Sequence, residues 1–273
     1  MKNNKVIGLK TSLLNLNKNR SLTNKVYKNE EYERIFAIHK KRISPILCKM
    51  KKDNLLKYEP DEIWMNNLIL KIGLTIKSSP PNLLHGYLLY SKLREMFQSI
   101  INEEFLIVET GTAKGFGSLV MAQATFDHNV KAQILSFDTL KLPVKRFWNA
   151  YNDEVGQRNF QELTNEFRKN LECILFINKR SKSLDLHLTK RRVHFAFLDS
   201  SHTFNTVSRE IKIISKYQKS GDLIFLDDVN DITYPGIKKA VKNAESCKLY
   251  EFEYVEGIDN RNYAIGIRRG EKF

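Results

Sequence analysis

Two short segments of the sequence each place carboxylates directly after an apolar run. HFAFLDSSHTF carries Asp199, and LIFLDDVND carries Asp227 and Asp228. If the two runs are neighbouring strands of a parallel sheet, their carboxyl ends meet at one edge and bring these side chains together. Three carboxylates at close range raise one another's pKa unless a cation or bound protons compensate them. The three residues therefore predict a metal site, and their oxygen atoms favour magnesium, manganese or calcium over zinc.

A histidine lies three residues after the first of these acids. His202 is a candidate general base, because a histidine side chain titrates near neutral pH and can accept a proton from a hydroxyl group. The same side chain could instead hydrogen-bond the loop before the next helix, and the sequence leaves both roles open. His194, inside the preceding apolar run, is interpreted as structural.

A glycine-rich segment, VETGTAKGFGS, follows another apolar run. Gly111 permits a sharp turn, while Gly115 and Gly117 let the backbone approach a ligand at the start of the next helix. The segment does not match a dinucleotide fingerprint, because alanine and phenylalanine occupy the second and third glycine positions. It also lacks the Gly-Lys-Ser/Thr of a phosphate-binding loop. The pattern predicts a loop for a nucleotide-like cofactor of another kind.

The elements that must position these residues follow from the apolar pattern. After residue 104, short apolar runs alternate with amphipathic segments, which is typical of a parallel sheet with helices on both faces. The last two runs resemble a hairpin, so we expect the final strand to be antiparallel. The predicted strands are 105–109, 133–138, 173–178, 193–199, 223–227, 249–254 and 263–267.

Helical periodicity predicts three helices before the sheet and several within it. Pro45 is expected to interrupt or end the first of them. The predicted helices are Glu30–Met50, Glu62–Leu74, one through Leu84 to Phe97, one after Thr203 and one beginning near Pro235.

The tandem prolines of Ser78–Pro81 oppose both helix and strand, and they mark the predicted domain boundary. We expect a basic, helical N-terminal extension over residues 1–80, with residues 1–28 loosely ordered. Residues 81–273 form the second predicted domain.

Most of the net charge of +14 belongs to the amino-terminal part of the chain. Residues 1–58 hold 15 Lys/Arg and 4 Asp/Glu. This charge suits an anionic partner such as nucleic acid, a nucleotide-linked substrate or a lipid surface, or it belongs to a solvated arm. Few aromatic residues accompany it, so a base-stacking surface is not indicated.

The remaining composition indicates a protein of the cytoplasm. No apolar run approaches the ~20 residues that a membrane span needs, and no signal-peptide core is present. The three cysteines, far apart in the sequence, fit reduced thiols. The sequence leaves both a monomer and a homo-oligomer open.

In chain order, VETGTAKGFG, FDTL, FWNAYND, FAFLDSSHTF, GDLIFLDDV and YPGIKKAV resemble motifs of class I S-adenosylmethionine-dependent methyltransferases. The resemblance covers Phe105–Ile267 and is to the bacterial group that includes macrolide-sugar and cephalosporin-pathway enzymes. It implies a Rossmann-like α/β fold with a seven-stranded, mostly parallel sheet. It also implies a cofactor site, in which Asp138 receives the ribose hydroxyls and Ser181 lies near the adenine. The implied cofactor-binding residues are Glu109, Gly111, Thr112, Gly115, Gly117, Asp138 and Ser181.

The same resemblance implies roles for the acids and the histidine. In metal-dependent members, magnesium is bound by positions that correspond to Asp199, Asp227 and Asp228. His202 occupies the position of a catalytic lysine or histidine, so Asp199 and His202 are the implied catalytic residues. A metal ion bound to the acceptor hydroxyl would lower its pKa. Ala113 stands where many members have a glycine.

The leading prediction is metal-assisted O-methylation of a small hydroxylated molecule, such as a sugar or nucleotide-sugar. Residues 139–159, with Arg146, Trp148 and Tyr151, are candidates to line its site. A nucleic-acid methyltransferase guided by the basic arm is the second candidate. It is disfavoured because Asp199-Ser200-Ser201-His202 replaces the Asn/Asp-Pro-Pro-aromatic motif of amino-directed enzymes. The sequence also leaves open a non-catalytic binding protein and an NAD(P)-linked reductase.

Overall fold

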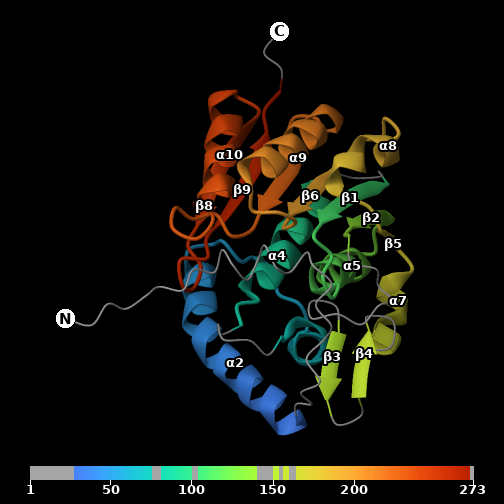
Figure 1. Cartoon of the computed structure of the whole chain (residues 1–273), viewed down its shortest axis with the longest axis vertical. Helices are drawn as coiled ribbons and strands as arrows, with labels where there is room; N and C mark the ends of the chain where they lie inside the picture. Colours follow the sequence, from blue (N-terminus) through green and yellow to red (C-terminus); the bar gives the residue numbers. More distant parts are fainter. Residues whose placement is uncertain are drawn as a thin grey trace, which may run out of the picture.

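The structure is a computed structural model, and it describes residues 28–75, 81–99, 104–139, 150–153, 156–159 and 164–270. Its centre is a seven-stranded sheet with the order β5-β2-β1-β6-β7-β9-β8 (Figure 1). All seven predicted strands are confirmed, with ends that differ by no more than two residues. The strands of this sheet are β1 (Phe105–Thr110), β2 (Ala132–Phe137), β5 (Ile174–Ile177), β6 (Phe195–Leu198), β7 (Leu223–Leu226), β8 (Tyr250–Val255) and β9 (Tyr263–Arg268).

The sheet is mostly parallel. Strand β1 pairs in parallel with β2 and β6, β2 with β5, and β6 with β7. Strand β9 is antiparallel to both β7 and β8, which confirms the prediction for the final strand. All six residues of β1 are buried. A near-continuous apolar run is expected here, because a parallel strand in the middle of such a sheet has helices on both sides.

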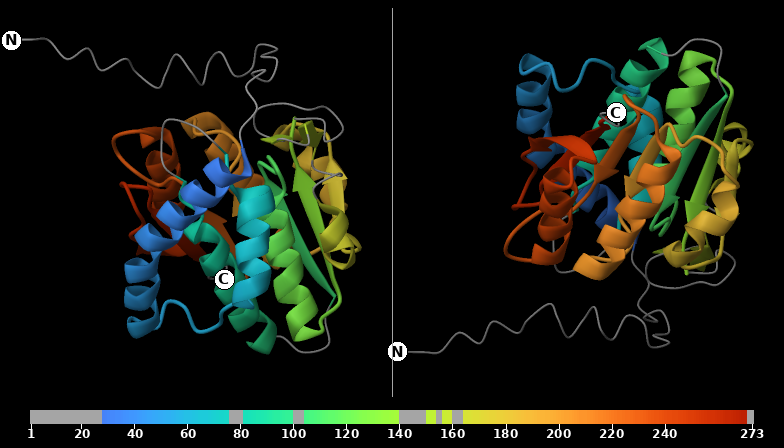
Figure 2. Two further views of the ribbon diagram at one scale, coloured as in Figure 1. Left: turned by 90° about the horizontal axis from the view of Figure 1, so that it is seen from below. Right: turned by 90° about the horizontal axis from the view of Figure 1, so that it is seen from above.

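Helices cover both faces of the sheet (Figure 2). Helices α4 (Leu84–Ser99) and α5 (Phe116–His128) pack in one apolar core, and α8 (Leu184–Leu188), α9 (Phe204–Tyr217) and α10 (Pro235–Ser246) pack in the other. This arrangement confirms the predicted fold class. The local sequence explains α9 well. Thr203 caps its first turn by accepting from the Thr206 N–H, and Val207, Ile211 and Ile214 are buried on one side. Burying each of these side chains stabilises the fold by about 1.5–3 kcal/mol.

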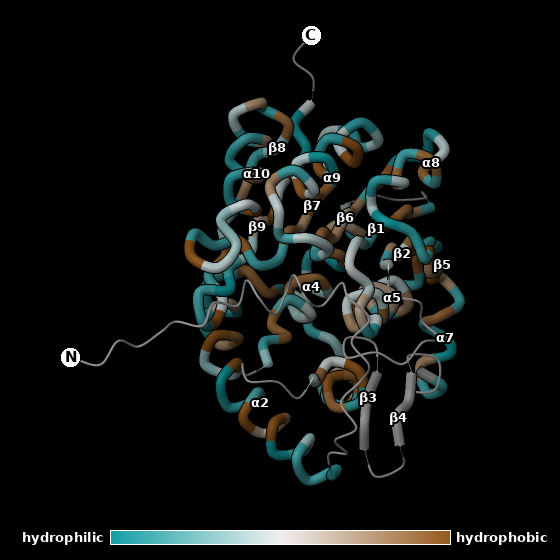
Figure 3. The backbone as a smooth tube through the Cα atoms, in the orientation of Figure 1, coloured by the Kyte–Doolittle hydropathy of each residue, from teal (hydrophilic) through white to brown (hydrophobic). Residues whose placement is uncertain are grey.

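Helix α2 spans Asn29–Lys52 and continues through Pro45, so the prediction that this proline interrupts or ends the helix was wrong. Pro45 is exposed, so water can satisfy the carbonyl group that loses its partner. Tyr32 and Met50, on either side of the proline, are both buried in the same apolar core as residues of α4 and α5. Figure 3 shows apolar and polar residues alternating along α2, as expected for a helix with one buried side. Tertiary packing therefore holds both halves of the helix in line.

Helix α3 (Glu62–Leu68) begins where Asp61 accepts a hydrogen bond from the Trp64 N–H, and it continues as a π-helical segment, Ile69–Gly73. Together they confirm the predicted helix over 62–74. Met65 and Ile72 have no exposed surface and belong to the same core as α4 and α5. The N-terminal helices thus pack against the sheet domain, and the division at residue 80 stays a prediction.

The remaining described elements are short. They include β3 (Ala150–Asp153) paired with β4 (Gly156–Asn159), the 3₁₀ turns Thr164–Phe167 and Ser181–Ser183, and α7 (Arg168–Leu171). The expected loose order of 1–28 falls almost wholly outside the described residues, as do Arg146 and Trp148. Among the helices that the structure describes, none combines the length and the apolar character needed to cross a membrane. The cytoplasmic location stays a prediction.

Candidate active site

The three strands at the centre of the sheet end at the same level. Thr110 of β1 is in register with Leu198 of β6, which is in register with Leu226 of β7. The residues that follow these strand ends, Gly111, Asp199 and Asp227, therefore emerge side by side at one edge. This is the edge where ligands bind in open parallel sheets.

Gly111 is in close backbone contact with the end of β6. Its φ of +94° is a left-handed conformation that favours glycine, and an added Cβ would lie 2.2 Å from the Asp199 carbonyl oxygen. The Asp199 N–H in turn donates to the Thr110 carbonyl at 2.9 Å. A glycine is thus required here for both backbone conformation and space.

The rest of the glycine loop is held by its own contacts. Gly115, with a φ of +83°, donates its N–H to the Thr112 carbonyl at 2.6 Å and opens α5. Gly117 lies against a side chain of β1, since an added Cβ would be 2.4 Å from Oε1 of Glu109. The buried ammonium group of Lys114 donates to the Leu74 carbonyl and so joins the loop to the N-terminal helices.

Glu109 is buried beneath this loop among hydroxyl groups. Ser118 and Ser136 donate to its Oε2, and the hydroxyl of Thr112 lies 2.6 Å from that of Ser136. Burial raises the pKa of Glu109 to about 7, and the negative charge of Asp138 adds to the rise. The hydroxyl groups oppose this shift only in part. Glu109 is therefore partly protonated near neutral pH.

Two further residues of the predicted cofactor site lie at the ends of β2 and β5. The Asp138 carboxylate accepts from the Ala113 N–H at 2.8 Å, which ties it to the glycine loop. The hydroxyl of Ser181 hydrogen-bonds to Glu210, as does that of Ser200 at 2.5 Å. A cavity of about 350 Å³ opens beside them, lined by Thr139, Asn178, Lys179, Arg180, Lys182 and Ser183.

Glu210 is a further buried acid near the site that was not predicted, although the sequence carries a signal for it. Glu210 is 1% exposed on the apolar side of α9, between Val207 and Ile211. Burial raises the pKa of its carboxyl group. A charged residue within an apolar helical stripe is seldom fully buried unless other groups satisfy it.

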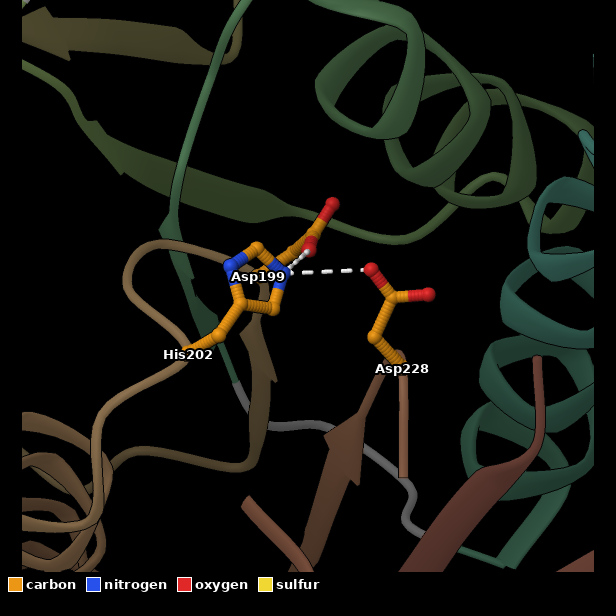
Figure 4. Close-up of side chains that lie close together, drawn as sticks. All are labelled: Asp199, His202 and Asp228. Atoms are coloured by element: carbon orange, nitrogen blue, oxygen red, sulfur yellow. Dashed lines mark hydrogen bonds and ion pairs between the residues drawn. The ribbon is translucent and has the colours of Figure 1, made fainter. Parts of the chain in front are cut away.

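Asp199, His202 and Asp228 form one cluster at the edge of β6 and β7 (Figure 4). Nε2 of His202 lies 3.1 Å from Oδ2 of Asp228 and 3.8 Å from Oδ1 of Asp199. The imidazole ring stacks on Tyr234, with ring centroids 4.0 Å apart. Asp228 has a φ of 59°, which turns the chain sharply after β7. Contacts with Asp199 after β6, Asp228 after β7 and Tyr234 before α10 thus fix the orientation of the His202 ring.

Asp227 lies outside this cluster, although it is the neighbour of Asp228. Its buried carboxylate accepts from Nη2 of Arg261 at 2.7 Å and from the Asp228 N–H at 2.6 Å. Nε of Arg261 lies 2.6 Å from Oδ1 of Asp228, and Nδ1 of His85 lies 3.6 Å from Oδ2 of Asp227. Sequence analysis missed Arg261 and His85, because neither lies in a recognisable motif.

The pKa values of the two acids beside His202, Asp199 and Asp228, are shifted in opposite directions. Burial and the charges of Asp227 and Asp228 raise the pKa of Asp199 well above its usual range. Burial acts to raise the pKa of Asp228 too, but the charge of Arg261 and the hydrogen bond with His202 outweigh it and lower that pKa. Asp228 is therefore an ionised partner for the histidine.

The three ligand atoms of the cluster lie within 4.8 Å of one another, and among the described residues this is the group suited to a metal ion. It contains two of the three predicted ligands, with His202 in place of Asp227. Magnesium prefers six oxygen ligands, so a set that includes an imidazole nitrogen fits it less well than the predicted set of carboxylates. Magnesium and the assignment of Asp227 as a ligand stay predictions.

Comparison with known proteins agrees with this geometry. Residues 108–229, which span the glycine loop and all the acids of the cluster, match a family described as a methyltransferase domain. The chain carries a methyltransferase domain. This domain and the shared fold agree with the predicted S-adenosylmethionine-dependent methyltransferase of class I. No curated protein matches the sequence significantly.

Solved structures of methyltransferases share the fold at low sequence identity. A putative O-methyltransferase from Klebsiella pneumoniae is 12% identical, with a TM-score of 0.55 over 85% of this chain and 100% of that one. An O-methyltransferase from Bacillus cereus, solved with S-adenosylhomocysteine, is 13% identical, with a TM-score of 0.51 over 87% of this chain and 100% of that one. The O-methyltransferase TomG from Streptomyces achromogenes, involved in tomaymycin synthesis and solved with S-adenosylmethionine, is 13% identical, with a TM-score of 0.51 over 88% and 99%.

Proposed function

We propose that this methyltransferase methylates a hydroxyl oxygen of a small molecule, such as a sugar or nucleotide-sugar. The observation that carries the proposal is the position of His202. Its Nε2 faces two carboxylates at the strand edge next to the glycine loop, where a base for an acceptor hydroxyl is needed.

The cofactor would lie along the ends of β1, β2 and β5. Gly111 and Gly115 provide the turn that approaches it, and Asp138 is anchored where the ribose hydroxyls would reach a carboxylate. The cavity beside Asn178 and Ser183 is the place for the adenine. A cofactor held in this way would supply its methyl group next to Asp199 and His202.

The proposed reaction is an in-line displacement. The acceptor oxygen attacks the methyl carbon, the new O–C bond forms as the S–C bond breaks, and the products are the methyl ether and S-adenosylhomocysteine. Nε2–H of His202 donates to the Asp228 carboxylate, so the ring takes the hydroxyl proton at its other nitrogen, Nδ1. Asp228, held ionised by Arg261, then stabilises the imidazolium ion.

Metal assistance is the second way to activate the hydroxyl, and the convergence of Asp199, His202 and Asp228 supports it. A divalent ion held by these residues would lower the pKa of a bound hydroxyl. The two ways exclude each other at Nε2 of His202, because this nitrogen donates its hydrogen to Asp228 in the first way and would have to lose that hydrogen to coordinate a metal ion in the second.

The test replaces His202 with alanine and measures S-adenosylhomocysteine release with a panel of sugars and nucleotide-sugars. Transfer is expected to fall about 100-fold or more, with partial recovery at high pH, where the hydroxyl ionises more readily. Affinity for S-adenosylhomocysteine, measured by calorimetry, should stay within about threefold, because the cofactor contacts lie on other strands.

The control is His128→Ala, which removes a partly buried histidine at the end of α5. Full activity of His202→Ala would reject the base assignment. Tight binding of NADH without binding of either adenosyl compound would reject the methyltransferase site itself.

A further inference from the structure

Arg261 brings a positive charge into the acidic edge of the sheet. It lies in the loop between β8 and β9, on the far side of β7 from the glycine loop. Its Nη2 donates to Asp227 and its Nε contacts Asp228, so one guanidinium group bridges the two consecutive acids. The Asp227 side chain has no exposed surface, and an ionised carboxylate there requires a partner of opposite charge.

The loop that carries Arg261 is braced from several sides. Asp259 forms an ion pair with Arg42 of α2, and the side-chain amide of Asn82 donates to the Ile258 carbonyl at 3.3 Å. Gly257 packs against the turn, since an added Cβ would lie 2.0 Å from the Arg261 carbonyl oxygen. The N-terminal helical region therefore helps to set the position of the arginine.

We infer that Arg261 is the resident cation of the active site, a positioning residue that occupies Asp227 and Asp228 in place of a divalent metal ion. The part that concerns catalysis rests on the proposed O-methyl transfer. In that part, Arg261 holds the Asp228 carboxylate in place beside His202, and the histidine acts as base without a metal ion.

The physical reason is the permanence and the shape of the guanidinium group. It stays protonated in proteins, and its planar fork of donors matches carboxylate oxygens. A metal ion on the three predicted aspartates would have to displace Arg261 from two of them. A metal ion on the smaller cluster would share Asp228 with the guanidinium group and be repelled by its charge.

The first experiment measures metal binding directly and needs no acceptor substrate. The wild-type chain is titrated with MgCl2, MnCl2 and ZnCl2 by calorimetry at physiological ionic strength. We expect no saturable binding that depends on Asp228, and we expect Arg261→Gln to acquire such binding for Mn²⁺. Stoichiometric Mg²⁺ or Mn²⁺ binding by the wild type, lost in Asp228→Asn, would overturn the inference.

The second experiment measures turnover on the acceptor that the panel identifies. Chelation with EDTA should leave wild-type turnover within about twofold. Arg261→Gln should lower kcat about 100-fold, while KM for S-adenosylmethionine stays within about threefold of the wild-type value. The kcat of Arg261→Lys should be at least about tenfold higher than that of Arg261→Gln. Loss of wild-type turnover in EDTA, or full activity of Arg261→Gln, would overturn the inference.

The matched control is Arg192→Gln. Arg192 also forms an ion pair with a buried aspartate, Asp222, but at the opposite ends of the same strands. The Arg192→Gln variant should have a lower melting temperature than the wild type and an unchanged ratio of kcat to KM. If Arg261→Gln does not fold, the wild-type titration and Arg261→Lys still decide the question. If no acceptor is methylated, the proposed function fails while the metal titration still tests Arg261.

Discussion

Strands β6 and β7 have an ion pair between an arginine and a buried aspartate at each end, and the two sites differ in their balance of charges. At the amino ends, Nη2 of Arg192 lies 2.8 Å from Oδ1 of Asp222, which also accepts from the Lys219 N–H at 2.5 Å. At the carboxyl ends, Arg261 faces Asp227 and Asp228, with Asp199 beside them. Among the described residues, the first site sets one acid against one arginine, whereas the second sets three acids around one arginine.

This difference teaches that an internal ion pair does not itself mark an active site. What distinguishes the proposed active site is its excess negative charge, because this charge faces the partly exposed His202 and can stabilise an imidazolium ion. The Arg192–Asp222 pair orders the strand starts, at the opposite end of the strands from His202. Each prediction below changes one side of this comparison.

The largest effect on stability is expected for Asp227→Ala. This substitution leaves Arg261 partly uncompensated and should lower the free energy of unfolding by about 3–5 kcal/mol. Urea denaturation measures the loss, and turnover should fall with it. Asp222→Ala is the matched control, with a similar loss of stability and unchanged turnover of the folded fraction. Equal turnover losses in the two variants would remove the functional distinction between the strand ends.

Glu109→Gln tests a third case, a buried carboxylate surrounded by hydroxyl groups instead of an arginine. The pKa of Glu109 is raised from 4.5 to about 7, so the folded chain binds this proton more tightly than the unfolded chain. Its contribution therefore makes the free energy of unfolding fall as pH rises from about 4.5 to about 7, and become constant above that. The variant should lack this pH dependence. Its free energy of unfolding should therefore rise by about 3 kcal/mol relative to that of the wild type between pH 4.5 and pH 8.

The measurement is urea denaturation of both proteins at several pH values. Glu251→Gln, which changes an exposed glutamate on β8, is the control and should follow the wild-type profile. Parallel profiles for the wild type and Glu109→Gln would show that the hydroxyl groups suffice to keep Glu109 ionised at neutral pH.

The smallest effect on stability is expected for Arg42→Ala, which removes the ion pair between α2 and the loop of Arg261. A partly exposed pair of this kind contributes about 0–1 kcal/mol, so the melting temperature should barely change. Turnover should fall severalfold if the brace positions Arg261. Lys40→Ala is the control, because Lys40 on the same helix pairs with Glu62 of α3 instead. Equal turnover in the two variants would separate α2 from the active site.

The sequence predicts the sheet and much of the site because both depend on local patterns. Asp199 and Asp228 follow buried strands whose order and register bring their ends together, and His202 lies only three residues from Asp199. Pro45 was misjudged because burial of Tyr32 and Met50 outweighs its local effect. Arg261 could not be predicted, since its position depends on a loop held by the distant Asn82 and Arg42.

The contact between Gly111 and the Asp199 carbonyl has a consequence for how the two reactants are aligned. In the proposed site, the turn would support the methyl donor and the end of β6 would support the acceptor, and the two meet directly through main-chain atoms. Side chains that do not take part in this main-chain contact could therefore be exchanged to suit another acceptor while the contact itself is kept. The specificity of such an enzyme can diverge while its reaction geometry stays the same.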